Sequence, residues 1–310
     1  MSPRKPVELR PQFIEVTPDL QQFGRVHQPI DAEAPIFTKP IRAAVHRWLV
    51  EMQAEEELRA VDLEPRRAAL LGGLPGTGKT TLAHHIAARL GLALVEISMP
   101  ALTSMYLGET GKNVRKLFAD AVSQHQKMIL FLDEIDAIAA ARIHTSTSAA
   151  HEKNAIVIAM MSEIDHYPGT IIAATNRPDQ IDSAMWRRFG LHLDIPAPDS
   201  DTRYAILCKY LEPFELDADA MGLLSDLTTG ATPALLRQMM EGIKRDLVLQ
   251  PRFGGENTPV AVIERVISAL APHADAACPP LWADMPGSLR RLKSLPWPPI
   301  RKDDPRETAK

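Results

Sequence analysis

One short segment of the sequence combines glycine, lysine and threonine at a spacing suited to holding phosphate groups. Gly73 and Gly78 have four residues between them, and Lys79 and Thr80 follow directly. Glycines allow the backbone to wrap closely around an anion with its N–H groups pointing inward. A lysine at this position reaches the β- and γ-phosphates of a nucleotide, and the threonine hydroxyl binds Mg²⁺. The pattern therefore predicts a phosphate-binding loop.

The residues around this loop predict a strand before it and a helix after it. Residues 68–71 are apolar, and residues 81–90 carry apolar side chains at helical spacing. A helix that begins at the loop presents a partial positive charge to bound phosphates. A mere glycine-rich turn would not need this order of strand, loop and helix. We expect ATP and Mg²⁺ as cofactors. The expected nucleotide contacts from this segment are Gly73, Pro75, Gly76, Thr77, Gly78, Lys79, Thr80 and Thr81.

An acidic pair supplies the second part of the expected chemistry. Asp133 and Glu134 follow five consecutive apolar residues, 128–132, which is typical of a central parallel strand covered on both faces. Asp133 is expected to hold Mg²⁺ together with Thr80, and Glu134 to orient and activate the attacking water. An acidic pair at a strand end is a weak signal by itself. It becomes a strong one because it follows a phosphate-binding loop.

Three further residues are expected near the transferred phosphate. Asn176 follows the apolar stretch 170–174, and ligands of parallel sheets bind at the carboxyl ends of strands. Turn chemistry before a proline would also explain this asparagine. Arg187 and Arg188 end a short predicted helix, where a guanidinium from a neighbouring subunit could stabilise charge on the phosphoryl group. An ordinary surface pair of arginines is the alternative.

A regular alternation of strands and helices would position these residues. Apolar strands are expected at 68–71, 93–97, 128–132, 170–174 and 191–195, with amphipathic helices between them. Such alternation favours an α/β fold with a parallel sheet flanked by helices. We expect this large α/β domain to span residues 41–198. A small all-helical lid domain is expected at 199–271, with prolines at two helix starts.

The two ends of the chain are expected to be less regular. Residues 1–40 are rich in proline and predict an irregular N-terminal arm. Residues 272–310 form a proline-rich C-terminal tail, which is either disordered or ordered through Trp282 and Trp297. Tryptophan rarely stands free in solvent, which keeps the second alternative open.

Composition excludes several classes of protein. The 310 residues carry a formal net charge of −4, which argues against a protein that coats nucleic acid. Two cysteines do not make a disulfide framework, and both are expected to be packing residues. No apolar run reaches the length of a membrane helix, and the first residues contain no hydrophobic signal segment. We expect a soluble, cytoplasmic protein.

The order of these motifs resembles the AAA+ ATPases over roughly residues 60–270. The resemblance rests on the phosphate-binding loop, on Asp-Glu-Ile-Asp at 133–136, on Ala-Thr-Asn-Arg-Pro at 174–178, and on the segment 182–189 before a helical lid. It implies ATP hydrolysis to ADP and phosphate. It also implies a homo-oligomeric ring, a hexamer, with ATP at subunit interfaces and Arg187 and Arg188 acting in trans as arginine fingers.

Within this family, residues 102–109 resemble the first pore loop that grips a polypeptide in the ring channel. Its expected tip is formed by Met105, Tyr106, Leu107 and Gly108. A buried aromatic staple is the alternative for the tyrosine. Residues 142–151 fall where the second pore loop lies, and Gly230-Ala231 resembles the lid signature of the AAA subclass, so Ala231 is expected to contact the nucleotide. The segment that usually helps to form the adenine pocket is not evident in residues 30–40.

The substrate is the least determined part of the expected function. The leading hypothesis is a ring that remodels or unfolds a protein through its pore. The compact single module and aromatic pore loop look most like the bacterial HORMA-domain remodelling ATPases of the pachytene-checkpoint type, which are linked to CBASS antiphage defence. A nucleic-acid motor or loader is the first alternative, and the acidic net charge weighs against it. A nucleotide-switched scaffold is the second, disfavoured by Glu134, Asn176 and both arginines.

Overall fold

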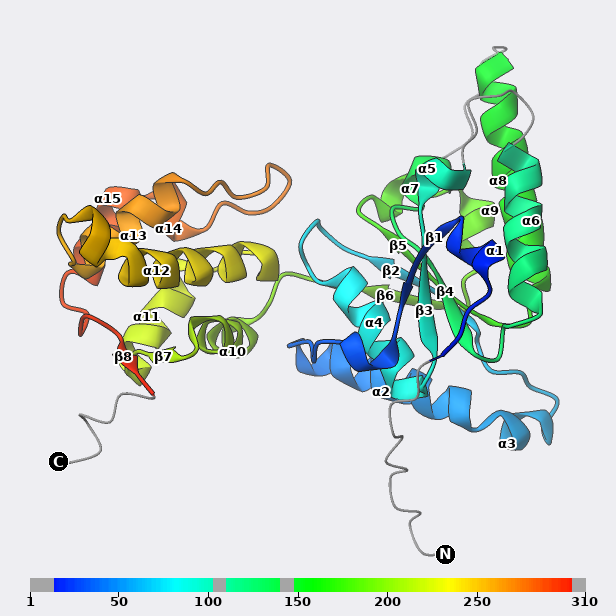
Figure 1. Cartoon of the computed structure of the whole chain (residues 1–310), viewed down its shortest axis with the longest axis horizontal. Coiled ribbons are helices and arrows are strands. Elements are labelled where there is room, and N and C mark those ends of the chain that lie inside the picture. The colour runs from blue at the N-terminus through cyan, green and yellow to red at the C-terminus, as the bar shows by residue number, and fades with distance from the viewer. Residues whose placement is uncertain (1–13, 103–109, 140–147, 303–310) are drawn as a thin grey trace, which may run out of the picture. The chain divides into compact units, whose positions relative to one another are not determined.

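The computed structural model describes residues 14–102, 110–139 and 148–302, which divide into two compact units (Figure 1). The first unit is an α/β unit and holds the described residues within 1–35, 40–73 and 79–195. The second is a helical unit and holds residues 36–39, 74–78 and the described residues from 196 onward. Residues 103–109, which include the expected pore-loop tip, and 142–147 of the expected second pore loop lie outside the described residues.

A six-stranded sheet forms the centre of the α/β unit. Its order is β1-β3-β4-β5-β2-β6, and every neighbouring pair is parallel except β1 with β3. All residues of the two middle strands β4 and β5 are buried, as their apolar sequences predict. The bounds of the strands are β1 Gly24–His27, β2 Ala68–Gly72, β3 Ala93–Ile97, β4 Met128–Leu132, β5 Thr170–Thr175 and β6 Leu191–Asp194.

Helices cover both faces of this sheet. Helix α4 (Lys79–Leu90) lies against one face, and α6 (Thr110–Val122) packs with α8 (Ser148–His166) on the other (Figure 1). The expected α/β fold with a parallel-dominated sheet between helices is confirmed. The helices of this unit that follow residue 38 and have not yet been named are short apart from α2. They are α2 Lys39–Gln53, α3 Glu55–Arg59, α5 Met99–Leu102, α7 Asp136–Ala139, η2 Pro178–Gln180 and α9 Ser183–Trp186.

The N-terminal segment is more ordered than expected. The prediction of an irregular arm over residues 1–40 is wrong for residues 18–31, which contain α1 (Pro18–Gln21), β1 and the short 3₁₀ helix η1 (Pro29–Asp31). Leu20 and Phe23 are buried in the core of the α/β unit. This burial supplies the apolar area that orders a segment with weak local propensity. The period-2 and helical patterns here are too short to be recognised in the sequence.

The helical unit begins with four helices whose starts are set by capping residues. Asp199 and Asp217 accept hydrogen bonds from backbone N–H groups of the first turn, and Thr232 and Thr258 do the same ahead of a proline. Such caps satisfy donors that have no partner within the helix. The helices are α10 Ser200–Leu211, α11 Ala218–Leu227, α12 Pro233–Phe253 and α13 Pro259–Ser268. Among the described helices, none combines the length and apolar character that a membrane crossing requires.

The C-terminal segment completes the core of the helical unit. It contains α14 (Pro280–Ala283), α15 (Met285–Leu292) and strand β8 (Ile300–Arg301), which pairs antiparallel with β7 (Phe214–Glu215). The Nε1–H groups of the two tryptophans donate to the Leu270 carbonyl and to Asn257 Oδ1, each at 3.0 Å. The ordered alternative for this segment is therefore correct over residues 280–301. Proline content alone did not reveal the buried leucines of α14 and α15.

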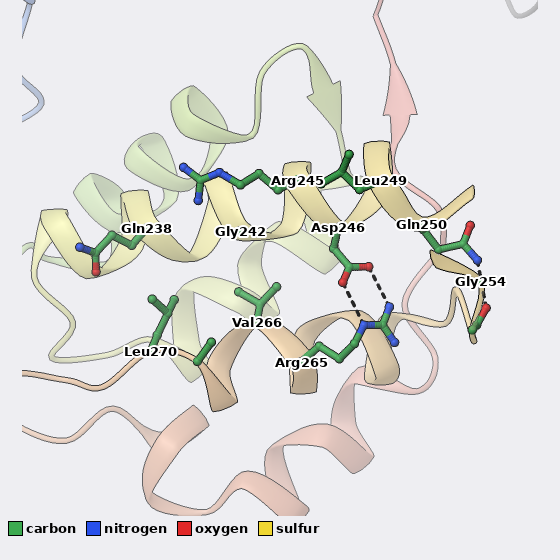
Figure 2. A pocket seen from close by; sticks show the side chains of 12 residues that line it. Gln238, Gly242, Arg245, Asp246, Leu249, Gln250, Gly254, Arg265, Val266 and Leu270 are labelled. Carbon is green, nitrogen blue, oxygen red and sulfur yellow. Dashed lines mark hydrogen bonds and ion pairs between the residues drawn. The ribbon is translucent and has the colours of Figure 1, made fainter. Parts of the chain in front are cut away.

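A cavity of about 620 Å³ lies between α12 and α13 in the helical unit (Figure 2). Its wall contains an ion pair in which the Arg265 guanidinium donates to both oxygens of Asp246, at 2.9 and 2.7 Å. The rest of the wall is mainly apolar, with Leu249, Val266 and Leu270. No residue of this cavity was expected to do chemistry.

Candidate functional site

Backbone conformation in the loop after β2 requires glycine. Gly76 and Gly78 have φ angles of 78° and 97°, in the region that other residues rarely adopt. The Gly76 carbonyl accepts a hydrogen bond of 3.1 Å from the Ala234 backbone N–H, and a Cβ at Gly76 would stand 2.8 Å from the Ala234 Cβ. Thr77 is buried, and its N–H and hydroxyl both donate to the Leu74 carbonyl. Pro75 between them is half-buried.

Lys79 is the first residue of α4 and is buried at the sheet edge. Its Nζ donates to the Gly73 carbonyl at 2.8 Å and to Asn176 Oδ1 at 2.7 Å. Burial lowers the pKa of this ammonium below its ordinary value, and the nearby carboxylates of Asp133, Asp136 and Glu134 partly offset that shift. The structure therefore brings Lys79 and Asn176 together, although 97 positions separate them in the sequence.

Thr80 and Asp133 meet at the carboxyl end of β4. The Thr80 hydroxyl donates to Asp133 Oδ2 at 2.9 Å, and Asp133 Oδ1 accepts from the Glu134 N–H at 2.9 Å. Hydroxyl and carboxylate oxygens are the donors that Mg²⁺ prefers. Asp136, one turn further on, has a buried Oδ1 for which the described residues provide no hydrogen bond. These oxygen donors fit a magnesium ion. Thr81, which follows Thr80 in α4, is half-buried.

Glu134 has a strained backbone at an exposed position. Its φ of 51° places a non-glycine residue in the left-handed region, which costs of the order of 1–3 kcal/mol. The next residue anchors this turn, because the Ile135 N–H donates to the Ala174 carbonyl at 2.9 Å. Strain of this kind gathers at functional sites, since the surrounding structure must hold it. The turn leaves the Glu134 side chain exposed beside the Thr80–Asp133 pair.

The acidic pair borders a cavity of about 400 Å³ in the α/β unit. The cavity extends from the carboxyl end of β4 along the end of β3 to the edge strand β1. It gives the carboxylates of Asp133 and Glu134 access to a ligand. Besides these two residues, the wall is formed by Gly24, Arg25, Glu96, Ile97, Ser98 and Met99.

The two arginines that follow α9, Arg187 and Arg188, differ in their environment. Arg188 is half-buried, and its guanidinium donates to Asp165 at 3.1 Å and to the Ala184 carbonyl at 2.9 Å. Arg187 is exposed, and its Nε donates to the Ser183 carbonyl at 3.2 Å. Arg187 is therefore the more accessible of the two, whereas Arg188 forms an ion pair with a neighbouring helix.

Two residues of the helical unit concern the expected base contacts. Ala231 is buried in the turn that precedes α12, where its N–H donates to the Thr228 carbonyl at 3.0 Å. Phe37, which the sequence did not single out, has ring atoms 3.4 Å from the position that a Cβ on Gly78 would occupy. The segment Ile36–Lys39 therefore packs with the loop 74–78. The sequence signal for this residue is only that an apolar side chain precedes a helix.

A phosphate-binding loop followed by a helix, with Thr80 on Asp133 and Lys79 on Asn176, defines a P-loop nucleoside triphosphatase. Comparison with known families indicates which kind of P-loop protein the chain resembles. The family described as "ATPase family associated with various cellular activities (AAA)" matches residues 69–197. Over these residues the chain is similar to the ATPases of this family, which hydrolyse ATP.

Similar proteins come from archaea and from an insect. The chain is 35% identical over 203 residues to the proteasome-activating nucleotidase of Methanopyrus kandleri, an alignment that covers 63% of this chain and 46% of that protein. It is 33% identical over 203 residues to the nucleotidase of the same name from Pyrococcus furiosus, covering 64% and 50%. It is 35% identical over 197 residues to spastin of Drosophila grimshawi, covering 60% and 24%. The chain spans about half the length of the nucleotidases it matches.

Proposed function

We propose that this AAA ATPase works as a hexameric ring that remodels or unfolds a protein substrate drawn into its central pore. The observation that carries the ATPase part is the pair of contacts Lys79–Asn176 and Thr80–Asp133, which join the loop helix α4 to the ends of β4 and β5. The remodelling part is supported by similarity to a nucleotidase that activates the proteasome. The motif order at 174–189 supports the ring.

In the proposed reaction, Lys79 binds the β- and γ-phosphates, and Thr80 and Asp133 hold Mg²⁺, which neutralises phosphate charge. Lys79 then exchanges its contact with Asn176 for one with phosphate, which frees the asparagine amide to position a water molecule. Glu134 accepts a proton from that water molecule as the water oxygen attacks the γ-phosphorus. The bond from the γ-phosphorus to the bridging oxygen breaks, and ADP and phosphate are released.

The proposed ring completes this site with arginine from the next subunit. Arg187 is the better placed of the two arginines, because it is exposed while Arg188 pairs with Asp165. A finger of this kind contributes about 10³–10⁵ in rate where it has been measured. In the same ring, Tyr106 would grip the substrate chain, and hydrolysis would move the Tyr106 loop.

The function is tested by trapping the substrate. Glu134→Gln should bind ATP but hydrolyse it poorly, so the ring should stay closed on its substrate. Pull-down of the tagged variant with ATP, compared with ADP, should enrich a protein in the ATP sample alone. Lys79→Ala, which should not bind ATP, serves as the control. Enrichment of nucleic acid in place of protein, with ATPase stimulated by DNA and binding lost as salt rises, would contradict remodelling of proteins.

The finer form of this proposal names a HORMA-domain protein as the substrate and antiphage defence in the cytoplasm as the setting. Its support is the aromatic-containing segment at 102–109. Purified protein should bind a HORMA-domain protein in the presence of ATP and release it from its complexes as ATP is hydrolysed. ATP hydrolysis without binding or release of such partners would exclude this substrate and leave the ATPase intact.

A further inference from the structure

A second group of possible metal ligands, distinct from Thr80 and Asp133, lies in the α/β unit. His27, His84 and Glu96 each offer one ligand atom, and these atoms lie within 4.8 Å of one another. His27 Nε2 and Glu96 Oε2 are 2.8 Å apart. The rings of His27 and His84 have centroids 4.3 Å apart and are tilted by 57°. Among the described residues, this is the one group in which three side chains of His, Cys, Asp or Glu lie close enough to hold an ion.

Three separate elements bring these side chains to one place. His27 is on β1, Glu96 on β3 and His84 on α4. The antiparallel register pairs His27 with Leu94, so that His27 and Glu96 project from the same face of the sheet. Helix α4 packs on β3 (Figure 1), and His84 comes from its second turn.

The close approach of β1 to β3 at this point depends on the glycine at position 24. Gly24 pairs with Ile97, and a Cβ at Gly24 would lie only 1.9 Å from the Glu96 carbonyl oxygen. Real Cβ atoms do not approach this closely, so any larger residue at position 24 would push the strands apart. The backbone of Glu96 is therefore held in position by β1 as well as by β4.

The donor set selects the class of metal. Two imidazole nitrogens and one carboxylate oxygen suit Zn²⁺ and similar divalent transition ions, whereas Mg²⁺ prefers oxygen donors alone. Zinc bonds of about 2.0–2.2 Å in a tetrahedral site place neighbouring ligand atoms about 3.4 Å apart. The three side chains therefore need small rotamer adjustments to close on an ion. All three residues are half-buried, which leaves room for entry of an ion and for a water ligand.

We propose that His27, His84 and Glu96 bind a divalent transition-metal ion of the zinc class, with water in the remaining position. The ion takes the place of the hydrogen bond between His27 Nε2 and Glu96 Oε2, and the neutral His27 ring then carries its one N–H on Nδ1. Its role is to fasten β1 to β3 and to α4. None of its three ligands belongs to the proposed magnesium or phosphate group, although Glu96 also lines the cavity beside Asp133 and Glu134.

The alternative is that these side chains only pack and hydrogen bond. A His–Glu contact and two neighbouring rings are stable without any metal. Equilibrium dialysis of the metal-stripped, full-length protein against Zn²⁺, with Mg²⁺ in excess, separates the two accounts. The proposal requires one tightly bound zinc ion per chain.

Variants locate the bound ion. His84→Ala and Glu96→Gln should each weaken zinc binding by more than about 100-fold, beyond the 10–100-fold typical of an outer partner. Glu96→Gln keeps the size of the side chain and a hydrogen-bond acceptor, so its effect reports ligand charge more than folding. His85→Ala is the matched control, because His85 is the next residue of α4, is also half-buried and is outside the group. It should bind zinc like the parent protein.

A second readout guards against loss of folding in the variants. Zn²⁺ should raise the melting temperature of the parent protein and of His85→Ala, and should leave that of His84→Ala unchanged. Bound Co²⁺ should give visible absorption bands of a four- or five-coordinate ion in the first two proteins alone. Equal zinc binding by the parent protein and His84→Ala, or no tight zinc binding by the folded parent, would overturn the proposal.

Discussion

Two consecutive turns of α4 carry different chemistry on the same helix. The first turn holds Lys79 and Thr80, which contact oxygen atoms of Gly73, Asn176 and Asp133. The next turn holds His84, which meets an imidazole and a carboxylate. Thr80 and His84 are four residues apart and share a helix face. The comparison teaches that the type of donor atom, rather than the supporting element, decides whether a turn suits Mg²⁺ with phosphate or a transition metal.

Lys79→Ala should affect the two turns most differently, because it should strongly reduce ATP hydrolysis and leave zinc binding intact. Loss of this ammonium removes the positive charge that binds the phosphates, so ATP hydrolysis should fall by at least about 10²–10³-fold. Phosphate release and binding of a fluorescent ATP analogue measure the effect. Zinc binding at His84 should be unchanged. If the variant lost zinc binding as well, the two turns would not be independent sites.

A smaller effect is expected for Thr80→Val, which keeps the shape of the side chain and removes its hydroxyl. The hydroxyl now donates to Asp133 and is proposed to bind Mg²⁺. The Mg²⁺ concentration that gives half-maximal ATPase activity should rise by at least about tenfold. Titration with Mg²⁺ at saturating ATP measures this shift. An unchanged Mg²⁺ requirement would remove Thr80 from the magnesium site and would weaken the contrast with the second turn.

The smallest effect is expected for Gly24→Ala, which acts on the second turn through the strands. The added Cβ would collide with the Glu96 carbonyl, so the free energy of unfolding should fall by about 1–3 kcal/mol. Zinc binding should weaken along with it, because β1 carries His27. Gly111→Ala in α6 is the control, since an added Cβ there meets no atom within 4 Å. Equal stability of the two variants would contradict the close approach of β1 and β3.

The nucleotide site at the first turn could be predicted, because most of its residues are neighbours in the sequence. Gly73 to Thr80 stand together, and Asp133 and Glu134 follow a strand whose apolar run is unmistakable. Parallel strands bring their carboxyl ends to one edge of the sheet, which predicts that Asn176 lies near the loop. Fold class and these contacts were therefore accessible from residue pattern and sheet topology.

The metal site at the second turn could not be predicted, because its residues come together only through the pairing of β1 with β3. His27 and Glu96 become neighbours only when β1 pairs antiparallel with β3, and β1 has four residues with a weak pattern. The ordering of β1 depends on burial of Leu20 and Phe23, a tertiary effect that local propensity does not report. The position of Phe37 beside Gly78 could not be predicted for the same reason, since it joins segments about forty residues apart in the sequence.

The central claim is that Glu134 activates the water that hydrolyses ATP. Its most direct test measures phosphate release and ATP binding side by side for the parent protein and Glu134→Gln. The account predicts that hydrolysis falls by about 10²–10⁴-fold, the contribution typical of a general base, while ATP affinity is retained. Hydrolysis at the parental rate by Glu134→Gln would contradict the mechanism.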